Sequence, residues 1–328
     1  MKPLIDAAIG DFCGNNGTLF PGKMVIADLG CSSGPNALTL VSTAVEAIMS
    51  HSLQFQHPPP EVFVLLNDLP HNDFNMVVKS LVTLHQNNNK FVLVTGVTPG
   101  SFYGRLFTSY SMHLICSSNN LHLLSKAPED LMRNHIPAYD TDEHATHERL
   151  RMVRKAYARQ FRKDFTLFLK LRDKELVPGG RMVLSLVGRC FDVIASNFFH
   201  IWETAAQILG VIASEGVIAK EKFDSFYIPM YGPSAEELKE IIEEQGSFSI
   251  RDMRVYDPRA DMDRALFTPS WLAKQKGAIF EPIIVEHFGA VMDEFERVTE
   301  RRLSLEGGMQ GDHARTSRAV LAVSLANA

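Results

Sequence analysis

The 328-residue sequence has no long apolar run, no excess of basic residues and no paired cysteine motif. No stretch approaches the ~20 consecutive apolar residues that a membrane-spanning helix needs, and the opening MKPLIDAAIG lacks the apolar core of a signal peptide. A net charge of −5 gives no positive field for a polyanion. We therefore expect a cytoplasmic protein that acts on small molecules and binds neither membrane nor nucleic acid.

Cysteine is sparse, and its four positions are scattered at Cys13, Cys31, Cys116 and Cys190. This spacing is typical of neither a disulfide scaffold nor a zinc site, and it fits a reducing compartment. The composition is otherwise ordinary for a globular protein, with 45% hydrophobic and 22% charged residues. The chain is long enough for one large α/β domain with an insertion.

Strand-like and helical segments alternate along much of the chain. Short apolar runs bounded by polar or glycine residues predict strands at 24–29, 61–70, 90–97, 112–118, 180–188, 248–257 and 318–327. Apolar positions three and four residues apart predict a long helix at 147–176, and another helix is expected at about 35–49. This order predicts an α/β fold with a doubly wound, mostly parallel seven-stranded sheet and ligands at the carboxyl ends of its strands.

Helical patterns interrupt this alternation at 190–245 and again at 270–304. Within the first, Ser234 followed by Glu237 predicts a capping box at the start of a helix. We expect a core made of residues 1–189 and 246–328, and a helical cap made of residues 190–245 with 262–304, lying over the acceptor pocket.

The segment MVIADLGCSSGPN, residues 24–36, passes from a strand through an acid into a glycine turn. Such a turn lets a ligand approach the backbone, and the following helix offers free amide donors. The pattern is not G-x-G-x-x-G, and Asp68, the next acid at a strand end, follows Gly30 by 38 residues, whereas a dinucleotide fingerprint has about 20. A lysine of the P-loop type is also missing.

Two acids remain, Asp28 before the glycines and Asp68 at the end of the second strand. A carboxylate at a strand end can bind two ribose hydroxyls, and one beside the turn can face a cationic amino-acid tail. This pairing suits S-adenosylmethionine, which has a ribose, an ammonium and a sulfonium. A connection without any ligand explains the turn alone equally well.

Six segments resemble, in order, the plant SABATH methyltransferases: ADLGCSSGPN, LLNDLPHNDFN, GVTPGSFYGRLF, SMHLICSSNNLHLLSKAPEDL, RKDFTLFLKLRDKELVPGGRMVL and FDSFYIPMYGPSAEEL. Members of this family transfer a methyl group from S-adenosylmethionine to carboxyls of salicylate, benzoate, anthranilate, jasmonate or indole-acetate, or to nitrogens of xanthine alkaloids. The resemblance extends over nearly the whole chain. It implies a class I, Rossmann-like methyltransferase fold, S-adenosylmethionine as cofactor and a homodimer.

The resemblance also implies site residues. Those of the cofactor pocket are Asp28, Gly30, Cys31 and Asn36 around the first turn, Asp68 and Leu69 at the ribose, and Ser101 and Phe102 beside the adenine. Those of the acceptor pocket are Asn119, His122 and Leu123, with Ile201 and Trp202 sandwiching the substrate ring. A set associated with magnesium in some members corresponds to Asn134, Asp224, Phe226 and Tyr227.

Several of these residues have a plain structural explanation. Without the resemblance, a small buried hydrophobe is the stronger interpretation of Cys31, and a core aromatic that of Phe102. Ile201 with Trp202 fits a helix face packed on the sheet equally well. For the magnesium set a structural role is the stronger interpretation, because Asp224 is its one carboxylate.

The sequence departs from the family pattern in two places. Where the family has tyrosine, histidine and tryptophan, this chain has Asn119, His122 and Leu123, so only His122 matches. The family also begins with a further segment, carrying a serine–tyrosine pair and a glutamine, while this chain starts at what looks like the following helix. Either the sequence is truncated or the enzyme is weakened.

A carboxylic acid with a pKa near ~4 is already ionised at neutral pH, so its methylation needs no general base. We expect His122 to act by donating a hydrogen bond to the acceptor carboxylate. The leading hypothesis is an S-adenosylmethionine-dependent O-methyltransferase for a small aromatic or hormone acid. A homologue that binds cofactor or carboxylates without efficient turnover is the alternative, and a nicotinamide oxidoreductase is disfavoured by the glycine pattern.

Overall fold

The computed structural model describes residues 1–14, 22–34, 36–86, 91–136, 138, 146–189, 198–256, 268–305 and 319–327. Within these residues one seven-stranded sheet has the order β3-β2-β1-β4-β5-β7-β6. The strands are β1 (Lys23–Leu29), β2 (Glu61–Asp68), β3 (Leu93–Pro99), β4 (Met112–Ser118), β5 (Leu176–Gly188), β6 (Phe248–Tyr256) and β7 (Ala319–Asn327). The first five pair in parallel, and β7 runs antiparallel to both β5 and β6. The predicted fold is confirmed.

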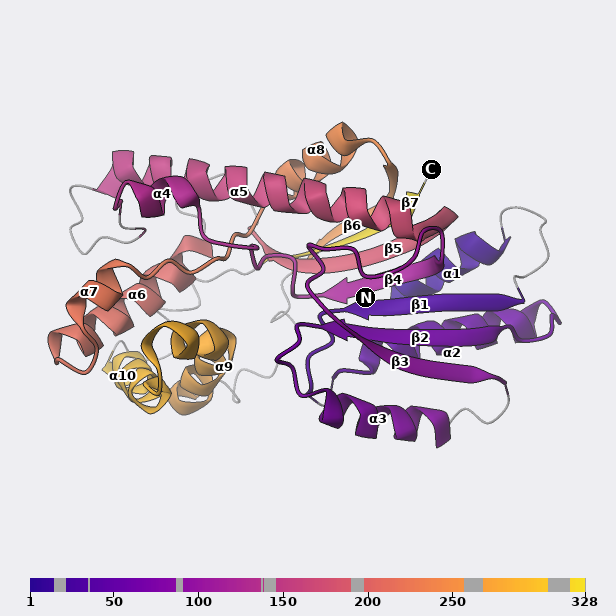
Figure 1. Ribbon diagram of the computed structural model, residues 1–328, viewed down its shortest axis with the longest axis horizontal. Helices are drawn as coiled ribbons and strands as arrows, with labels where there is room; N and C mark the ends of the chain where they lie inside the picture. The colour runs from indigo at the N-terminus through magenta and orange to yellow at the C-terminus, as the bar shows by residue number, and fades with distance from the viewer. Residues whose placement is uncertain are drawn as a thin grey trace.

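Helices cover both faces of this sheet (Figure 1). They are α1 (Lys2–Gly14), α2 (Thr39–Gln54), α3 (Phe74–Gln86), α4 (Glu129–Arg133), α5 (Thr146–Glu175), α6 (Phe198–Ser214), α7 (Lys220–Asp224), α8 (Ala235–Gln245), α9 (Pro269–Phe288) and α10 (Met292–Leu305). Buried side chains form two clusters, one joining α1, α2 and α3 to the sheet and one joining α5, α8 and the remaining helices to it. The sheet is therefore buried on both sides, as its apolar strands require.

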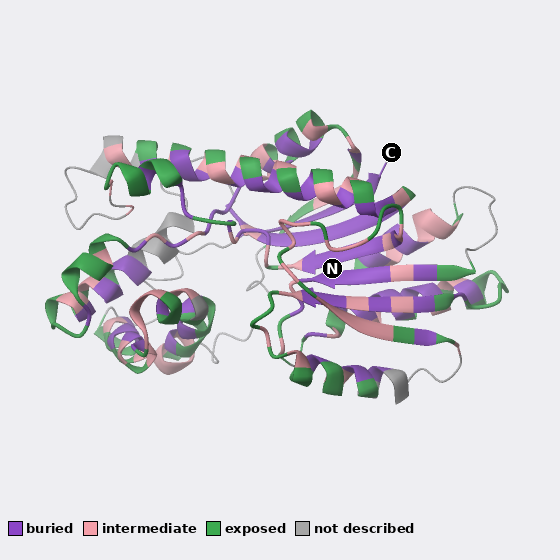
Figure 2. Ribbon diagram, viewed as in Figure 1, coloured by how far each residue is buried: buried purple, intermediate pink, exposed green. Residues whose placement is uncertain are grey.

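The long helix α5 follows its predicted apolar stripe. Val153, Tyr157, Phe161, Phe165 and Phe168 are each at most 2% exposed. Figure 2 shows this buried side of α5 turned toward the sheet and its other side exposed. The spacing of three and four residues places these side chains on one face of the helix, and their burial anchors it.

One predicted boundary is wrong, and one helical stretch is divided. The helix expected from residue 35 begins at Thr39, after a turn at 36–38, while Pro35 itself lies outside the described residues. The helical stretch expected over 270–304 consists of two helices, α9 and α10, which are separated because Gly289 takes a left-handed φ of 85° that a continuing helix does not allow.

The helices α6, α7, α9 and α10 gather at one end of the sheet, beyond the carboxyl ends of β1 and β4 (Figure 1). The helix α8 instead contacts α5 and β6. It starts with the predicted capping box, in which Ser234 Oγ accepts from the Glu237 amide and the Ser234 amide donates to the Glu237 carboxylate. The division into core and cap stays a prediction. No helix among the described residues combines the length and apolarity needed to cross a membrane.

Candidate active site

Three strands end beside one another at one edge of the sheet. The strand β1 lies between β2 and β4, and the chain continues to β3 on one side and to β5 on the other. In an open parallel sheet, ligands bind outside the carboxyl ends of the strands where the strand order reverses in this way. Asp28, Asp68 and Asn119 come at or directly after the ends of β1, β2 and β4. The sheet thus brings together the predicted cofactor and acceptor segments.

Asp28 is a buried carboxylate, only 4% exposed, in the ladder between Leu66 of β2 and Cys116 of β4. Among the described residues its Oδ1 has no hydrogen-bond partner. Burial, and secondly the charge of Asp68, raises the pKa of Asp28 to about 8. A positive group bound beside it would stabilise its ionised form, so the site is suited to a cationic ligand.

The glycine turn after β1 is fixed by the backbone carbonyl of Asn67 and by the side chain of Asn120. The amides of Gly30 and Cys31 both donate to the Asn67 carbonyl, at 2.9 Å. The Asn120 amide group donates to the carbonyls of Leu29 and Gly30. Gly30 has a φ of 78°, and an added Cβ would lie 2.3 Å from Asn120 Nδ2. Glycine is needed at this position for both reasons.

Asp68 faces this turn from the end of β2. Its Oδ2 accepts a hydrogen bond from the Ser32 amide and its Oδ1 accepts one from the Leu69 amide, both at 2.7 Å. Each carboxylate oxygen has a second lone pair, so the oriented carboxylate keeps acceptor capacity for hydroxyl groups. This arrangement supports the predicted ribose contact, which remains a prediction.

The other residues predicted for the cofactor differ in exposure. Cys31 is 5% exposed, and burial, followed by the charges of Asp28 and Asp68, raises the pKa of its thiol to about 12. It therefore stays protonated and acts as a small buried group rather than a nucleophile. Asn36 is exposed and Leu69 is 40% exposed, so both are accessible to a ligand.

Ser101 and Phe102 lie in the loop that follows β3. Ser101 is exposed, and its Oγ accepts from the Tyr103 amide at 3.2 Å. The half-buried Phe102 ring packs edge-on against Phe168 of α5, with 6.2 Å between centroids. Phe102 is thus at least partly a core aromatic, and its role beside an adenine stays a prediction.

The predicted acceptor residues follow β4. His122 is 7% exposed, and its carbonyl accepts from the Tyr231 amide at 2.8 Å. Leu123 pairs as an isolated antiparallel bridge with Met230. Asn119 is exposed with a φ of 58°, and its amide donates to the Ser185 carbonyl. Backbone contacts thus join this stretch to β5 and to the segment before α8.

Ile201 and Trp202 fall in the first turns of α6, but their side chains lie outside what the structure describes. Their predicted contact with a substrate ring remains a prediction.

The four residues of the magnesium set already serve other contacts. The Asn134 amide group donates to the Asp130 carbonyl, and Asp224 pairs with Lys220 at 2.8 Å. Phe226 is buried against the rings of His287 and Phe288, and Tyr227 Oη donates to the Ile136 carbonyl. Across the described residues no group of three or more histidine, cysteine or acidic side chains is placed to hold a metal ion. These donors do not fit Mg²⁺.

Sequence reasoning missed three residues that shape the site. Asn67 is fully buried, and its amide group donates to the carbonyls of Thr98 and Gly100. Asn120 joins the turns after β1 and β4, and Tyr103 joins the loop after β3 to Leu123. The sequence signal for the Asn67 contacts is a polar residue directly before an acid at the end of a strand, as in Asn67–Asp68.

S-adenosylmethionine fits the residues at this edge. Asp28 is a buried carboxylate whose Oδ1 could accept from the ammonium of the cofactor, and Asp68 presents oriented acceptors for the ribose hydroxyls. The fold and this site together define a class I S-adenosylmethionine-dependent methyltransferase.

Comparison with known proteins is more specific, because the profile of the SAM dependent carboxyl methyltransferase family matches residues 1–328. The chain belongs to this family. It is 40% identical over 308 residues to jasmonate O-methyltransferase of Arabidopsis thaliana, covering 83% of this chain and 79% of that protein. It is 34% identical over 356 residues to inactive anthranilate O-methyltransferase 1 of Zea mays, covering 100% and 90%. The solved structure of loganic acid methyltransferase with SAH superimposes with a TM-score of 0.83 at 28% identity, covering 99% of this chain and 91% of that one.

Proposed function

We propose that this carboxyl methyltransferase acts on a small aromatic or plant-hormone acid whose carboxylate binds next to His122. The observation that carries the proposal is the position of His122. This residue is nearly buried on the turn after β4, and β4 pairs with β1, the strand that carries Asp28. The relatives named jasmonate O-methyltransferase and anthranilate O-methyltransferase 1 support this class of acceptor.

The residues of this chain have mainly to bind the cofactor and the acceptor acid and to orient them toward each other. When bound, S-adenosylmethionine supplies an electrophilic methyl group on a sulfonium. Asp28 would hold its ammonium and Asp68 its ribose, while Ser101 and Phe102 would lie at the adenine. His122 would donate to the acceptor carboxylate, which is ionised at neutral pH and needs no base. Rate then comes from holding a carboxylate oxygen about 3 Å from the methyl carbon in a site that excludes water.

The acceptor wall is expected to favour a substrate other than salicylate. Asn119 makes one side more polar, and Leu123 makes the other smaller than the tyrosine and tryptophan of the family pattern. Ile201 and Trp202 of α6 would sandwich the ring. The extra volume left by Leu123 would suit a larger or non-planar acid.

A labelled-methyl transfer assay over salicylate, benzoate, anthranilate, jasmonate and indole-acetate tests the proposal, alongside calorimetric titration with S-adenosylmethionine. Transfer to one of these acids is expected. Absence of S-adenosylmethionine binding would overturn the cofactor site. Binding without transfer would favour the second candidate, a homologue that binds but turns over poorly. The observation that favours this candidate is the replacement of the family's tyrosine and tryptophan by Asn119 and Leu123.

We also propose a homodimer in the cytoplasm. Light scattering of the purified protein tests the first, with a mass near 73 kDa expected for two chains of 36.7 kDa each. A fluorescent fusion imaged in plant cells tests the second.

A further inference from the structure

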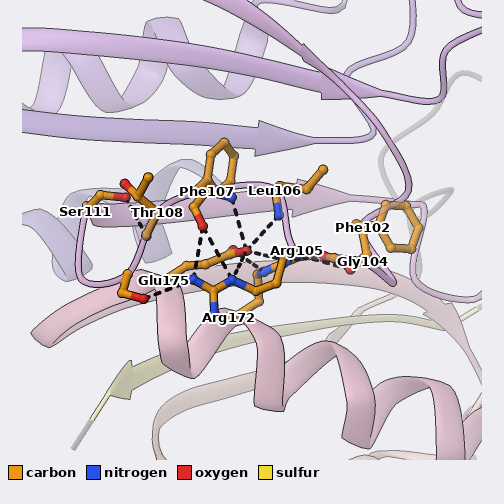
Figure 3. A network of polar contacts seen from close by, with 10 residues as sticks. Phe102, Gly104, Arg105, Leu106, Phe107, Thr108, Ser111, Arg172 and Glu175 are labelled. Atoms are coloured by element: carbon orange, nitrogen blue, oxygen red, sulfur yellow. Dashed lines mark hydrogen bonds and ion pairs between the residues drawn. The ribbon is translucent and has the colours of Figure 1, made fainter.

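A buried ion pair lies under the loop between β3 and β4, at the end of α5. Arg172 and Glu175 are fully buried, and Arg172 Nε lies 2.7 Å from Glu175 Oε2. Two charges removed from water must be fully satisfied by hydrogen bonds, since an isolated buried charge is strongly unfavourable. Here both partners bond the backbone of one loop, and Glu175 Oε1 also lies 3.3 Å from Nε of Arg105 in that loop (Figure 3).

The contacts to this loop are specific. Arg172 Nη1 donates to the Phe102 carbonyl at 2.9 Å, and Nη2 donates to the Gly104 carbonyl at 2.8 Å. Glu175 Oε1 accepts from the amides of Leu106 at 2.8 Å and Phe107 at 3.2 Å. The pair therefore supplies four hydrogen bonds to four residues of a segment that has no helix or strand of its own.

The bonds within the loop come mostly from side chains. The Gly104 amide donates to the Ser101 carbonyl, the Tyr103 amide donates to Ser101 Oγ, and the Arg105 guanidinium donates to the Phe107 carbonyl. At its end, the amides of Tyr110 and Ser111 donate to the last carbonyls of α5. Buried backbone groups need partners, so the middle of this loop depends on the ion pair for its conformation.

The start of the same loop is bonded to the cofactor edge. The Gly100 amide donates to the Asp68 carbonyl at 2.8 Å, and the Asn67 side chain donates to the Gly100 carbonyl. A ligand with its ammonium at Asp28 on β1 and its ribose at Asp68 on β2 extends in the direction of β3. Its base then reaches the loop that the ion pair supports.

We propose that Arg172 and Glu175 are positioning residues, which fix the loop 101–107 in the conformation that receives the base of the cofactor before the cofactor arrives. This rests on the proposed function, because it assumes that S-adenosylmethionine binds at Asp28 and Asp68. Neither residue touches the ligand; each acts through the backbone that carries Phe102.

The test compares two ligands that differ only in the base. S-adenosylhomocysteine carries adenine, and S-ribosylhomocysteine lacks it. Their dissociation constants are measured by calorimetric titration and competition for the wild type, Arg172→Lys and Glu175→Gln. Lysine cannot reach two carbonyls and a carboxylate together, and glutamine cannot balance the guanidinium charge. Each variant is expected to raise the dissociation constant of S-adenosylhomocysteine at least tenfold and that of S-ribosylhomocysteine less than twofold.

Arg181→Lys is the matched control. Arg181 is 6% exposed, its Nη1 donates to the Gly179 carbonyl at 2.8 Å, and it lies in β5 away from the loop. It should lower the melting temperature without changing either dissociation constant. The proposal is overturned when Arg172→Lys and Glu175→Gln lower the melting temperature but leave the ratio of the two constants as in the wild type. A wild type that binds neither ligand contradicts the proposed function instead.

A measurement on the wild type keeps the proposal testable when a variant does not fold. Hydrogen exchange of the free protein, resolved to single amides, should show Leu106 and Phe107 exchanging at least 100-fold more slowly than unprotected amides. Unprotected rates without ligand would show that the loop is not preformed, and would overturn the proposal.

Discussion

The hydroxyl of Tyr103 donates a hydrogen bond to the backbone carbonyl of Leu123, with 2.6 Å between the oxygens. Tyr103 belongs to the loop after β3, which is predicted to lie at the adenine, and Leu123 to the stretch after β4, which is predicted to hold the acceptor. Burial raises the pKa of the Tyr103 hydroxyl well above its ordinary value, so the donor stays protonated over the working range. One hydrogen bond thus joins the two halves of the site.

Replacing Tyr103 with phenylalanine removes this bond and little else. A net hydrogen bond of this kind contributes about 0.5–1.5 kcal/mol. We expect kcat/KM for the acid to fall about threefold to tenfold, through a looser acceptor stretch, with the cofactor dissociation constant changed less than twofold. Steady-state kinetics and calorimetric titration provide both values.

The control for this variant is Tyr110→Phe, which removes a hydroxyl from a side chain that is 66% exposed on the same loop. It should leave both quantities unchanged. A larger loss in cofactor affinity than in kcat/KM for Tyr103→Phe would show that the bond serves the cofactor loop alone.

His122→Ala tests the residue that carries the proposed function. A hydrogen bond to a charged group is worth about 1.5–3 kcal/mol, so kcat/KM for the acid should fall roughly tenfold to a hundredfold. Affinity for S-adenosylmethionine should change little, because Asp28 and Asp68 are untouched. His57→Ala, at an exposed position after α2, is the control. Equal losses in transfer and in cofactor affinity would contradict the assigned role.

The elements were predictable because their signals are local. The stripe Phe161, Phe165 and Phe168 predicts α5 within a residue at each end, since helix periodicity needs no knowledge of the rest of the chain. The same spacing continues to Arg172 and Glu175, which placed two charges on the buried face. Their partners are backbone groups some 70 residues earlier, and periodicity carries no information about them.

The candidate site was predictable where chemistry coincides with a strand end. Asp28 and Asp68 each close an apolar run, and parallel strands end at one edge. Asn67 and Asn120 were missed because they bind carbonyls of neighbouring strands, and those contacts depend on register rather than on sequence spacing. The break at Gly289 had a visible signal in the glycine itself, which the apolar pattern on both sides concealed.

Gly30→Ala should disrupt the turn after β1. The new Cβ would meet the Asn120 amide group, and alanine is strained at a φ of 78°. Backbone strain of this kind costs about 1–3 kcal/mol. We expect a lower melting temperature and weaker S-adenosylmethionine binding.

Gly10→Ala is the matched control, because an added Cβ in α1 meets nothing within 4 Å. It should raise the stability by about 0.5–1 kcal/mol through helix propensity. A Gly30→Ala variant as stable and as tightly binding as the wild type would contradict the close approach of the two turns.

Asp28 makes the stability of the free protein depend on pH. Its pKa in the folded state is about 8, raised from 3.8 by burial and then by Asp68. Between these values the folded chain holds a proton that the unfolded chain has lost, so stability falls as pH rises from 4 to 8 and levels off above. The slope approaches about 1.4 kcal/mol per pH unit. Asp28→Asn should flatten this part of the profile in thermal unfolding; an unchanged profile would contradict the shift.

Cofactor binding should lower the pKa of Asp28 again, so that affinity for the cofactor rises with pH where the stability of the free protein falls. An ammonium beside Asp28 stabilises the ionised carboxylate, so binding at pH 7 releases up to about one proton, and affinity rises up to tenfold per unit between pH 6 and 7. The neighbouring Cys31 and Cys116 thiols, whose pKa values burial raises, stay protonated in this range.

Calorimetry of S-adenosylmethionine binding in two buffers of different ionisation enthalpy measures the released proton. Asp28→Asn should abolish the release, while Asp224→Asn, a carboxylate paired with Lys220 on the exposed side of α7, should leave it intact. Release that persists in Asp28→Asn would place the titrating group elsewhere and remove the ammonium from this carboxylate.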